Sequence, residues 1–324
     1  MHLGILMFVT ERALPVTDLA RACEARGVES LWVPEHPIVP AQYETRYPLA
    51  EDGKMPRPYT ELPDCFATLA AAAAVTQELR VATGICLVPE RDPLHTALQV
   101  ATLDLLSGGR VLFGVGAGWL REEMQLFAPH FPHRFAFLRE AIAAMRKLWT
   151  EERPSFEGRW VRFPPVVCRP KPVQKPHPPV ILGGMGPNAR KRVAAWGDGW
   201  LPIGLPPDDV AEARREISRR ALEHDRDPEA ISLTVMIGAP PGLETPSLET
   251  IPDRDTLPAT GTQAPTASSS RSPPSAPTTP TATSTASHPP RRSTAHTATR
   301  TAVALLSAGG RRSFGPRAGR RRSS

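Results

Sequence analysis

Two residues that can exchange protons follow the second apolar segment of the chain. Ser30–Val33 is short and apolar, and Glu35 and His36 come just after it, flanked by a proline on each side. An imidazole can give or take a proton near neutral pH, or hydrogen-bond to a ligand. The alternative is that both residues only shape a turn between the prolines. Glu35 and His36 are therefore candidate catalytic residues.

A glycine-rich run, residues 114–118 (GVGAG), follows a later apolar segment. Glycine lets a backbone approach a flat ring or a phosphate closely, so Gly116 is a candidate cofactor-binding residue. The run reads GxGxG and not the dinucleotide-binding GxGxxG, and Glu140, at about the spacing of a ribose-binding acid, falls in an amphipathic helical pattern. Tight packing at the end of a strand is the alternative reading.

A second glycine-rich run, residues 183–190 (GGMGPNAR), leads from an apolar segment into a helical one. Free backbone N–H groups, the helix dipole and a nearby guanidinium all favour phosphate binding. Gly183, Gly184, Asn188 and Arg190 are therefore candidate ligands of a phosphate. The alternative is a helix start that needs glycine for its turn geometry.

Several other chemistries have no signature in this chain. There is no GxSxG, HExxH or Walker motif, and no cluster of His, Cys, Asp and Glu has metal-ligand spacing, so we expect no metal. The charged run Glu90, Arg91 and Asp92 is expected to be a solvated loop. Trp119 fits a core position as well as a ligand-stacking one.

Alternating segments must position these residues. Short apolar runs typical of buried strands are residues 2–8, 30–33, 80–88, 110–116, 180–182, 199–203 and 231–237. Helical patterns between and after them are residues 16–26, 63–77, 93–106, 135–149, 188–196 and 208–224. Seven such steps with apolar strands predict an α/β fold with a parallel sheet covered by helices. A (β/α)₈ TIM barrel is favoured over a doubly wound sheet, because polar and glycine-rich features follow several strands.

The charge is divided unevenly along the 324 residues, whose formal net charge is +6. Residues 1–240 carry 28 Lys and Arg against 29 Asp and Glu, whereas residues 241–324 carry 11 Arg and 4 acidic residues. Ser, Thr, Pro, Ala and Arg make up 63 of those last 84 residues, a composition typical of disorder. Only residues 301–306 there are weakly strand-like. We interpret the change as a shift of reading frame near residues 240–250.

Partners and compartment follow from the same composition. A near-neutral body argues against nucleic-acid binding, although the Arg-rich tail could contact phosphates. The chain has no apolar run long enough for a membrane span and no signal peptide, so we expect no membrane contact. Four widely spaced cysteines without a CxxC pair indicate reduced thiols and a cytoplasmic location.

Residues 1–240 resemble the luciferase-like monooxygenase family, in its branch of oxidoreductases that depend on the deazaflavin coenzyme F420. The segments that carry the resemblance, in this order, are SLWVPEH (30–36), VATGICL (81–87), QVATLD (99–104), SGGRV (107–111), GVGAGWLREE (114–123), FEGR (156–159), PKP (170–172), GG (183–184) and GDGW (197–200). The combination in this order is specific, while each segment alone is not.

This resemblance implies a (β/α)₈ barrel that holds F420, or alternatively FMN, at its C-terminal face. It places His36 near the reactive ring and a non-proline cis peptide near Gly84 and Ile85, which would buttress that ring. It also matches Gly183 and Gly184 to a cofactor-phosphate site. Some relatives have a catalytic Glu where this chain has Trp119, so no proton donor is implied there, and Glu123, four residues further on, is a weaker candidate.

Three functions remain open from the sequence. The first is F420-dependent hydride transfer to or from a small organic substrate, with the excursion at residues 37–62 lining the pocket. The second is an FMN-dependent monooxygenase. The third is an inactive or unstable barrel, since only seven of eight strands are evident in residues 1–240 and the last βα unit is not, which leaves two unpaired strand edges. Family members are often dimers, so the resemblance also admits a homodimer.

Overall fold

The computed structural model describes residues 2–127, 131–237 and 300–306. The strands are β1 (His2–Met7), β2 (Ser30–Val33), β3 (Arg80–Thr83), β4 (Cys86–Leu87), β5 (Val111–Gly116), β6 (Phe156–Glu157), β7 (Arg162–Phe163), β8 (Val180–Gly183), β9 (Gly199–Leu201), β10 (Ser232–Ile237) and β11 (Arg300–Leu306). The α-helices are α1 (Val16–Ala25), α2 (Cys65–Ala74), α3 (Pro93–Leu106), α4 (Arg121–Phe127), α5 (Arg134–Thr150), α6 (Pro187–Trp196) and α7 (Pro207–Leu222). Short 3₁₀ helices are η1 (Arg57–Thr60), η2 (Val88–Glu90), η3 (Phe131–His133) and η4 (Pro228–Ala230).

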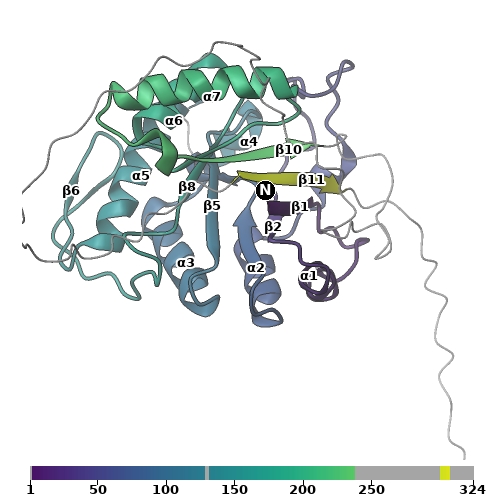
Figure 1. The fold of residues 1–324 in the computed structure, drawn as a ribbon, viewed down its shortest axis with the longest axis horizontal. Helices are drawn as coiled ribbons and strands as arrows, with labels where there is room; N and C mark the ends of the chain where they lie inside the picture. The colour runs from purple at the N-terminus through teal and green to yellow at the C-terminus, as the bar shows by residue number, and fades with distance from the viewer. Residues whose placement is uncertain (1, 128–130, 238–299, 307–324) are drawn as a thin grey trace, which may run out of the picture.

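Eight strands form a ring of parallel pairs. The ring runs β1, β2, β3, β5, β8, β9, β10 and β11, and β11 pairs back onto β1. The helices lie outside the strands, with α1, α2 and α3 on one side and α6 and α7 on the other (Figure 1). The predicted α/β barrel is confirmed. No helix within the described ranges is long and apolar enough to cross a membrane.

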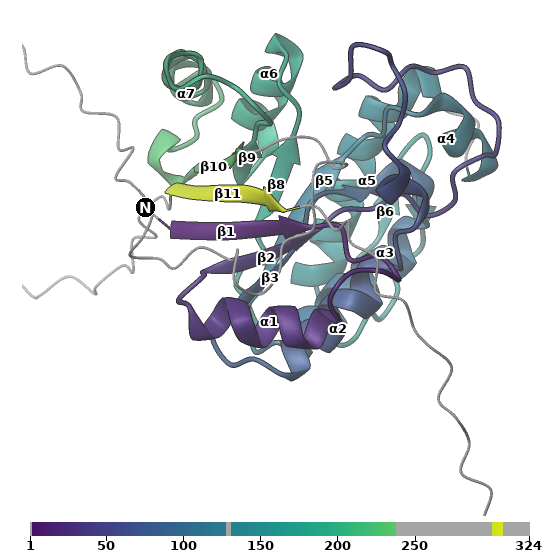
Figure 2. The same cartoon turned by 90° about the vertical axis from the view of Figure 1, so that its right-hand side faces the viewer.

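The strand of the last βα unit is present, which corrects the expected gap. β11 lies between β10 and β1 (Figure 2). Val303 is opposite Gly4 on one side and Met236 on the other. The edges of β1 and β10 carry backbone N–H and C=O groups that hydrogen-bond to a parallel strand between them. Residues 301–306 (TAVALL) are mostly apolar, as an inner strand of a sheet requires. Apart from β11, the expected disordered segment 241–324 and its frame shift lie outside the described residues.

The strands are apolar along their whole length because both of their faces are buried. Ile5 and Met7 of β1 point to the layer between strands and helices, while Leu6 points into the barrel. The cluster inside the barrel comprises Leu6, Phe8, Trp32, Ala82, Leu112, Ile181 and Leu201. The packed interior leaves the ends of the barrel as the places for a ligand.

The predicted strand 80–88 is split into β3 and β4. The peptide bond between Gly84 and Ile85 is cis, at the place that the family resemblance indicates. At this break the Thr83 hydroxyl donates to the Gly114 carbonyl oxygen at 2.7 Å. A Cβ on Gly114 would lie 2.1 Å from the Thr83 carbonyl oxygen, so this position of β5 has no room for a side chain.

We predict that Gly114→Ala lowers the free energy of unfolding by about 2–3 kcal/mol, because the clash is with backbone that the sheet holds in place. Gly186→Ala is the control. Its φ is −74° and no atom lies within 4 Å of its Cβ position, so the loss there should stay below about 1 kcal/mol. Urea unfolding of both variants measures the difference, and equal losses would contradict the packing role of Gly114.

Candidate active site at the carboxyl ends of the strands

His36 is buried just beyond the end of β2 and is bonded at both ring nitrogens. Its Nδ1 lies 2.5 Å from Glu123 Oε2 of α4, and the Trp119 indole N–H donates to its Nε2 at 3.2 Å. An indole nitrogen can only donate, so Nε2 is the acceptor and the proton of the neutral ring is on Nδ1, toward Glu123. These two contacts fix the tautomer and the orientation of His36.

Aromatic rings from the excursion at residues 37–62 enclose this histidine. The Tyr59 ring meets His36 edge-on with centroids 5.0 Å apart, and its hydroxyl lies 2.9 Å from that of Tyr47. Burial raises the pKa of both phenols, so they remain neutral hydrogen-bonding groups. The excursion is anchored on α4, where the backbone N–H groups of Glu44 and Thr45 donate to Glu122 Oε1.

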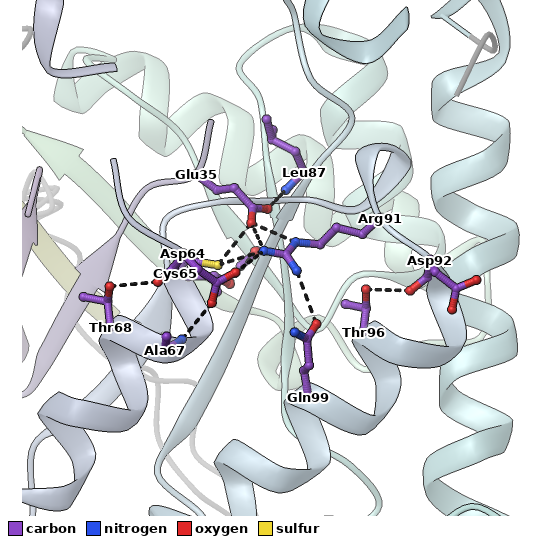
Figure 3. A network of polar contacts seen from close by, with 12 residues as sticks. Glu35, Asp64, Cys65, Ala67, Thr68, Leu87, Arg91, Asp92, Thr96 and Gln99 are labelled. Carbon is purple, nitrogen blue, oxygen red and sulfur yellow. Dashed lines mark hydrogen bonds and ion pairs between the residues drawn. The ribbon is translucent and has the colours of Figure 1, made fainter. Parts of the chain in front are cut away.

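Glu35 lies next to His36 in the chain but is engaged elsewhere. Figure 3 shows its carboxylate facing Arg91, which reaches it through Nε at 2.8 Å and through Nη2. The Leu87 backbone N–H donates to its other oxygen at 2.7 Å, and the Cys65 thiol donates at 3.3 Å. Glu35 therefore ties the end of β2 to β4, α2 and the loop before α3.

Arg91 extends this ion pair to two helices. Its guanidinium donates to Asp64, the N-cap residue of α2, at 3.0 Å and to Gln99 of α3 at 3.2 Å (Figure 3). The expected solvated loop at residues 90–92 is thus wrong for Arg91, because opposite charges from separate strand ends meet there. It is also wrong for Glu90, whose side chain is buried. All four cysteines are free, and Cys65 and Cys86 are buried beside Glu35.

Glu90 and Glu123 are two buried carboxyl groups beneath the loop that follows β5. Both are at most 3% exposed, and neither oxygen of Glu90 accepts a hydrogen bond from a described residue. Burial first, then the negative charges of Glu123 and Glu35, raise the pKa of Glu90 to about 9. Glu90 is therefore protonated at neutral pH, which avoids a second negative charge close to Glu123.

The glycines at the ends of β5 and β8 make room for one side chain. The Ile85 Cδ1 atom lies 2.1 Å from a Cβ built on Gly116 and 2.8 Å from one built on Gly183. Ile85, beside the cis bond, is thus seated on the bare backbone of two other strands. The structure brings Gly84, Ile85, Gly116 and Gly183 together, and the group that approaches Gly116 closely is the Ile85 side chain, as the tight-packing reading of this glycine run expects.

The start of α6 is open, as a phosphate site would need. Residues 184–188 are exposed, Gly184 has φ +115°, and the N-cap residue Gly186 offers no side-chain cap to the first turn. Asn188 lies in that turn. Arg190 is directed away from it, since its Nε lies 3.0 Å from Glu216 of α7.

Sequence reasoning found His36 but missed most of what holds it. Trp119 and Glu123 were seen only as ambiguous or weak candidates, and α4, which carries Glu123, was not predicted. The spacing of Trp119 and Glu123, four residues apart in GWLREE, could have indicated one helical face after the glycine run. Glu90 gave no signal, because a carboxyl beside an arginine is normally solvated.

Glu90→Gln should change how stability depends on pH. A folded-state pKa of about 9 against an ordinary value of 4.5 means that the wild type loses stability as pH rises between these values. The variant cannot ionise, so its stability relative to wild type should increase with pH, by up to about 1.4 kcal/mol per unit. Urea unfolding from pH 5 to 9 tests this, with the exposed Glu157→Gln as control. Parallel curves for wild type and Glu90→Gln would contradict the buried neutral acid.

The sequence of this chain is similar to one protein family and to several individual proteins. The model of the luciferase-like monooxygenase family matches residues 6–243. An uncharacterized protein of Mycobacterium tuberculosis is 36% identical over 239 residues, which are 72% of this chain and 84% of that protein. The F420-dependent glucose-6-phosphate dehydrogenase of Intrasporangium calvum is 32% identical over 206 residues, 56% of this chain and 61% of the enzyme.

Monooxygenases are also among the similar proteins. The FMNH(2)-dependent dimethylsulfone monooxygenase of Pseudomonas putida is 36% identical over 132 residues, 39% of this chain and 36% of that enzyme. Among solved structures, the monooxygenase RslO1 from Streptomyces bottropensis superimposes with a TM-score of 0.59 at 26% identity, covering 74% of this chain and 72% of RslO1. With the family match spanning most of its length, the chain belongs to the luciferase-like monooxygenase family.

Proposed function

We propose that this chain is a flavin- or deazaflavin-dependent oxidoreductase that uses coenzyme F420 for hydride transfer to or from a small organic substrate. One observation carries the proposal. His36, fixed by Trp119 and Glu123, and Ile85, seated on Gly116 and Gly183, lie at the carboxyl ends of parallel strands. This is the face at which barrel enzymes carry their active sites.

The residues at this face suit a flat ring with a phosphate attached. Ile85 offers a partly exposed apolar surface, and its side chain is held in place where it packs over Gly116 and Gly183. The uncapped start of α6, with Gly184 and Asn188, leaves backbone N–H groups for a phosphate. When bound, the deazaflavin supplies the carbon that carries the hydride.

His36 is the proposed proton-exchanging group. The Nε2 atom accepts a hydrogen bond from the Trp119 indole, and this bond must break before Nε2 can contact a ligand. The Nδ1 atom keeps its hydrogen bond to Glu123 with and without the ligand. A proton that arrives at Nε2 creates an imidazolium, which the Glu123 carboxylate stabilises. Tyr59 packs against the histidine, Tyr47 packs against Tyr59 and Trp119, and His36 is buried from water. Glu35 acts in this scheme as a positioning residue.

The extent of similarity favours F420 over FMN. The match to the F420-dependent relative extends over 206 residues, whereas that to the FMNH(2)-dependent relative extends over 132. The similarity to RslO1 supports the alternative, an FMN-dependent monooxygenase on the same barrel. The alternative of an inactive or unstable barrel was based on two unpaired strand edges. The pairing of β11 with both edges speaks against that alternative.

Titration with each cofactor tests the proposal. We expect F420 to bind with 1:1 stoichiometry by calorimetry and to raise the melting temperature, since a ligand at 100 times its Kd adds about 2.7 kcal/mol. FMN should bind more weakly. Tighter binding of FMN would select the monooxygenase, and cooperative melting with no response to either cofactor would contradict the proposed function.

His36→Ala should lower kcat/KM at least about 100-fold while the protein still binds F420, because only the proton transfer is lost. The rates are measured with F420 and a panel of small alcohols, aldehydes and sugar phosphates. His95→Ala is the matched control, since His95 lies on α3 with its side chain 84% exposed. Unchanged rates for His36→Ala on a substrate that the wild type converts would remove His36 from the chemistry.

A further inference from the structure

Three arginines and two phenylalanines alternate at the rim of the barrel, and we call them the arginine ladder. The guanidinium of Arg121 lies 5.2 Å from the Phe131 ring centre, and that of Arg134 lies 4.0 Å from it. Arg134 also stacks on Phe135 at 4.7 Å, and Arg192 of α6 lies over the same ring at 3.9 Å. Each ring thus contacts two guanidinium groups.

The ladder carries three positive charges that no carboxylate of the described residues neutralises in an ion pair. Arg91 and Arg190, in contrast, are paired with Glu35 and with Glu216. Burial, then repulsion from a neighbouring arginine, lowers the pKa of both Arg134 and Arg192. Gathering like charges in a half-buried place is unfavourable unless an anion joins them.

The ladder borders the proposed active site on two sides. Arg134 Nε donates to the carbonyl oxygen of Gly118, in the loop after β5 that carries Trp119, at 3.2 Å. Arg192 lies one helical turn after Asn188, so the two share the face of α6 that begins at its open N-terminus. A ligand that binds at the carboxyl ends of the strands and carries an anionic group could therefore place that group against the ladder.

We propose that Arg121, Arg134 and Arg192 bind the phosphate groups of a ligand that carries more than one negative charge. Guanidinium groups match phosphate oxygens with paired N–H donors, and the phenyl rings hold these forks in place without competing for them. The assignment rests on the proposed function only for its location beside the active site. The phosphate can belong to the cofactor or to a phosphorylated substrate, and both present the same chemistry.

Calorimetry with pyrophosphate at fixed ionic strength tests the ladder. We expect saturable 1:1 binding to the full chain, weakened at least tenfold in the double variant Arg134→Gln/Arg192→Gln. The control is Arg219→Gln. Arg219 lies on α7 and forms an exposed ion pair with Glu223, so this variant should bind pyrophosphate as the wild type does. Melting curves verify that each variant is folded. Equal affinities for wild type and the double variant, or tighter binding of triglutamate than of pyrophosphate, would overturn the proposal.

A second titration separates the two sources of phosphate and the two proposals. If pyrophosphate competes with F420, the ladder holds the cofactor's phosphate, and if both bind together, it holds the substrate's. Either result supports the ladder as a phosphate site. Binding of F420 without any binding of pyrophosphate would overturn the ladder and leave the proposed function standing. Binding of pyrophosphate that depends on the ladder, without any binding of F420 or FMN, would overturn the proposed function and leave the ladder standing as a phosphate site.

Discussion

The hydrogen bond between His36 and Glu123 connects the loop after β2 with the helix after β5, and the rest of the site is arranged around it. It sets the tautomer of His36, which in turn makes Nε2 the acceptor for Trp119. Its Glu123 partner lies near Glu90, whose pKa is raised first by burial and then by the negative charges of Glu123 and Glu35, so Glu90 stays neutral. The same helix, α4, anchors the excursion whose tyrosines cover the histidine. One buried contact thus determines charge, orientation and access.

Two buried acids inside the site are neutralised, whereas the ladder arginines at its rim have no acidic partner among the described residues. Inside, Glu35 is paired with Arg91 and Glu90 is protonated, because an uncompensated buried charge is costly. At the rim, the arginine ladder holds positive charge without an acid to balance it among the described residues. This contrast is the arrangement expected of a site that takes an apolar ring inward and leaves an anionic group at the edge.

Local sequence patterns predicted what depends on neighbouring residues. The apolar runs located the barrel strands to within a few residues, and the cis bond between Gly84 and Ile85 lies where the family resemblance placed it. What depended on distant segments was missed. Glu90 is buried because α4 and α5 pack on η2, and Arg190 faces away from the start of α6 because Glu216 of α7 is beside it. The strand β11 pairs with two open strand edges although more than 60 residues separate it from β10. Periodicity cannot report such contacts.

The central claim is that a deazaflavin binds at the carboxyl ends of the strands, between Ile85 and His36. A crystal structure of the chain with F420 tests it most directly. The account predicts the ring against Ile85, within reach of the His36 imidazole, and a phosphate near the start of α6. A cofactor bound elsewhere on the molecule, or one in the barrel mouth with Ile85 and His36 both out of contact, would contradict it.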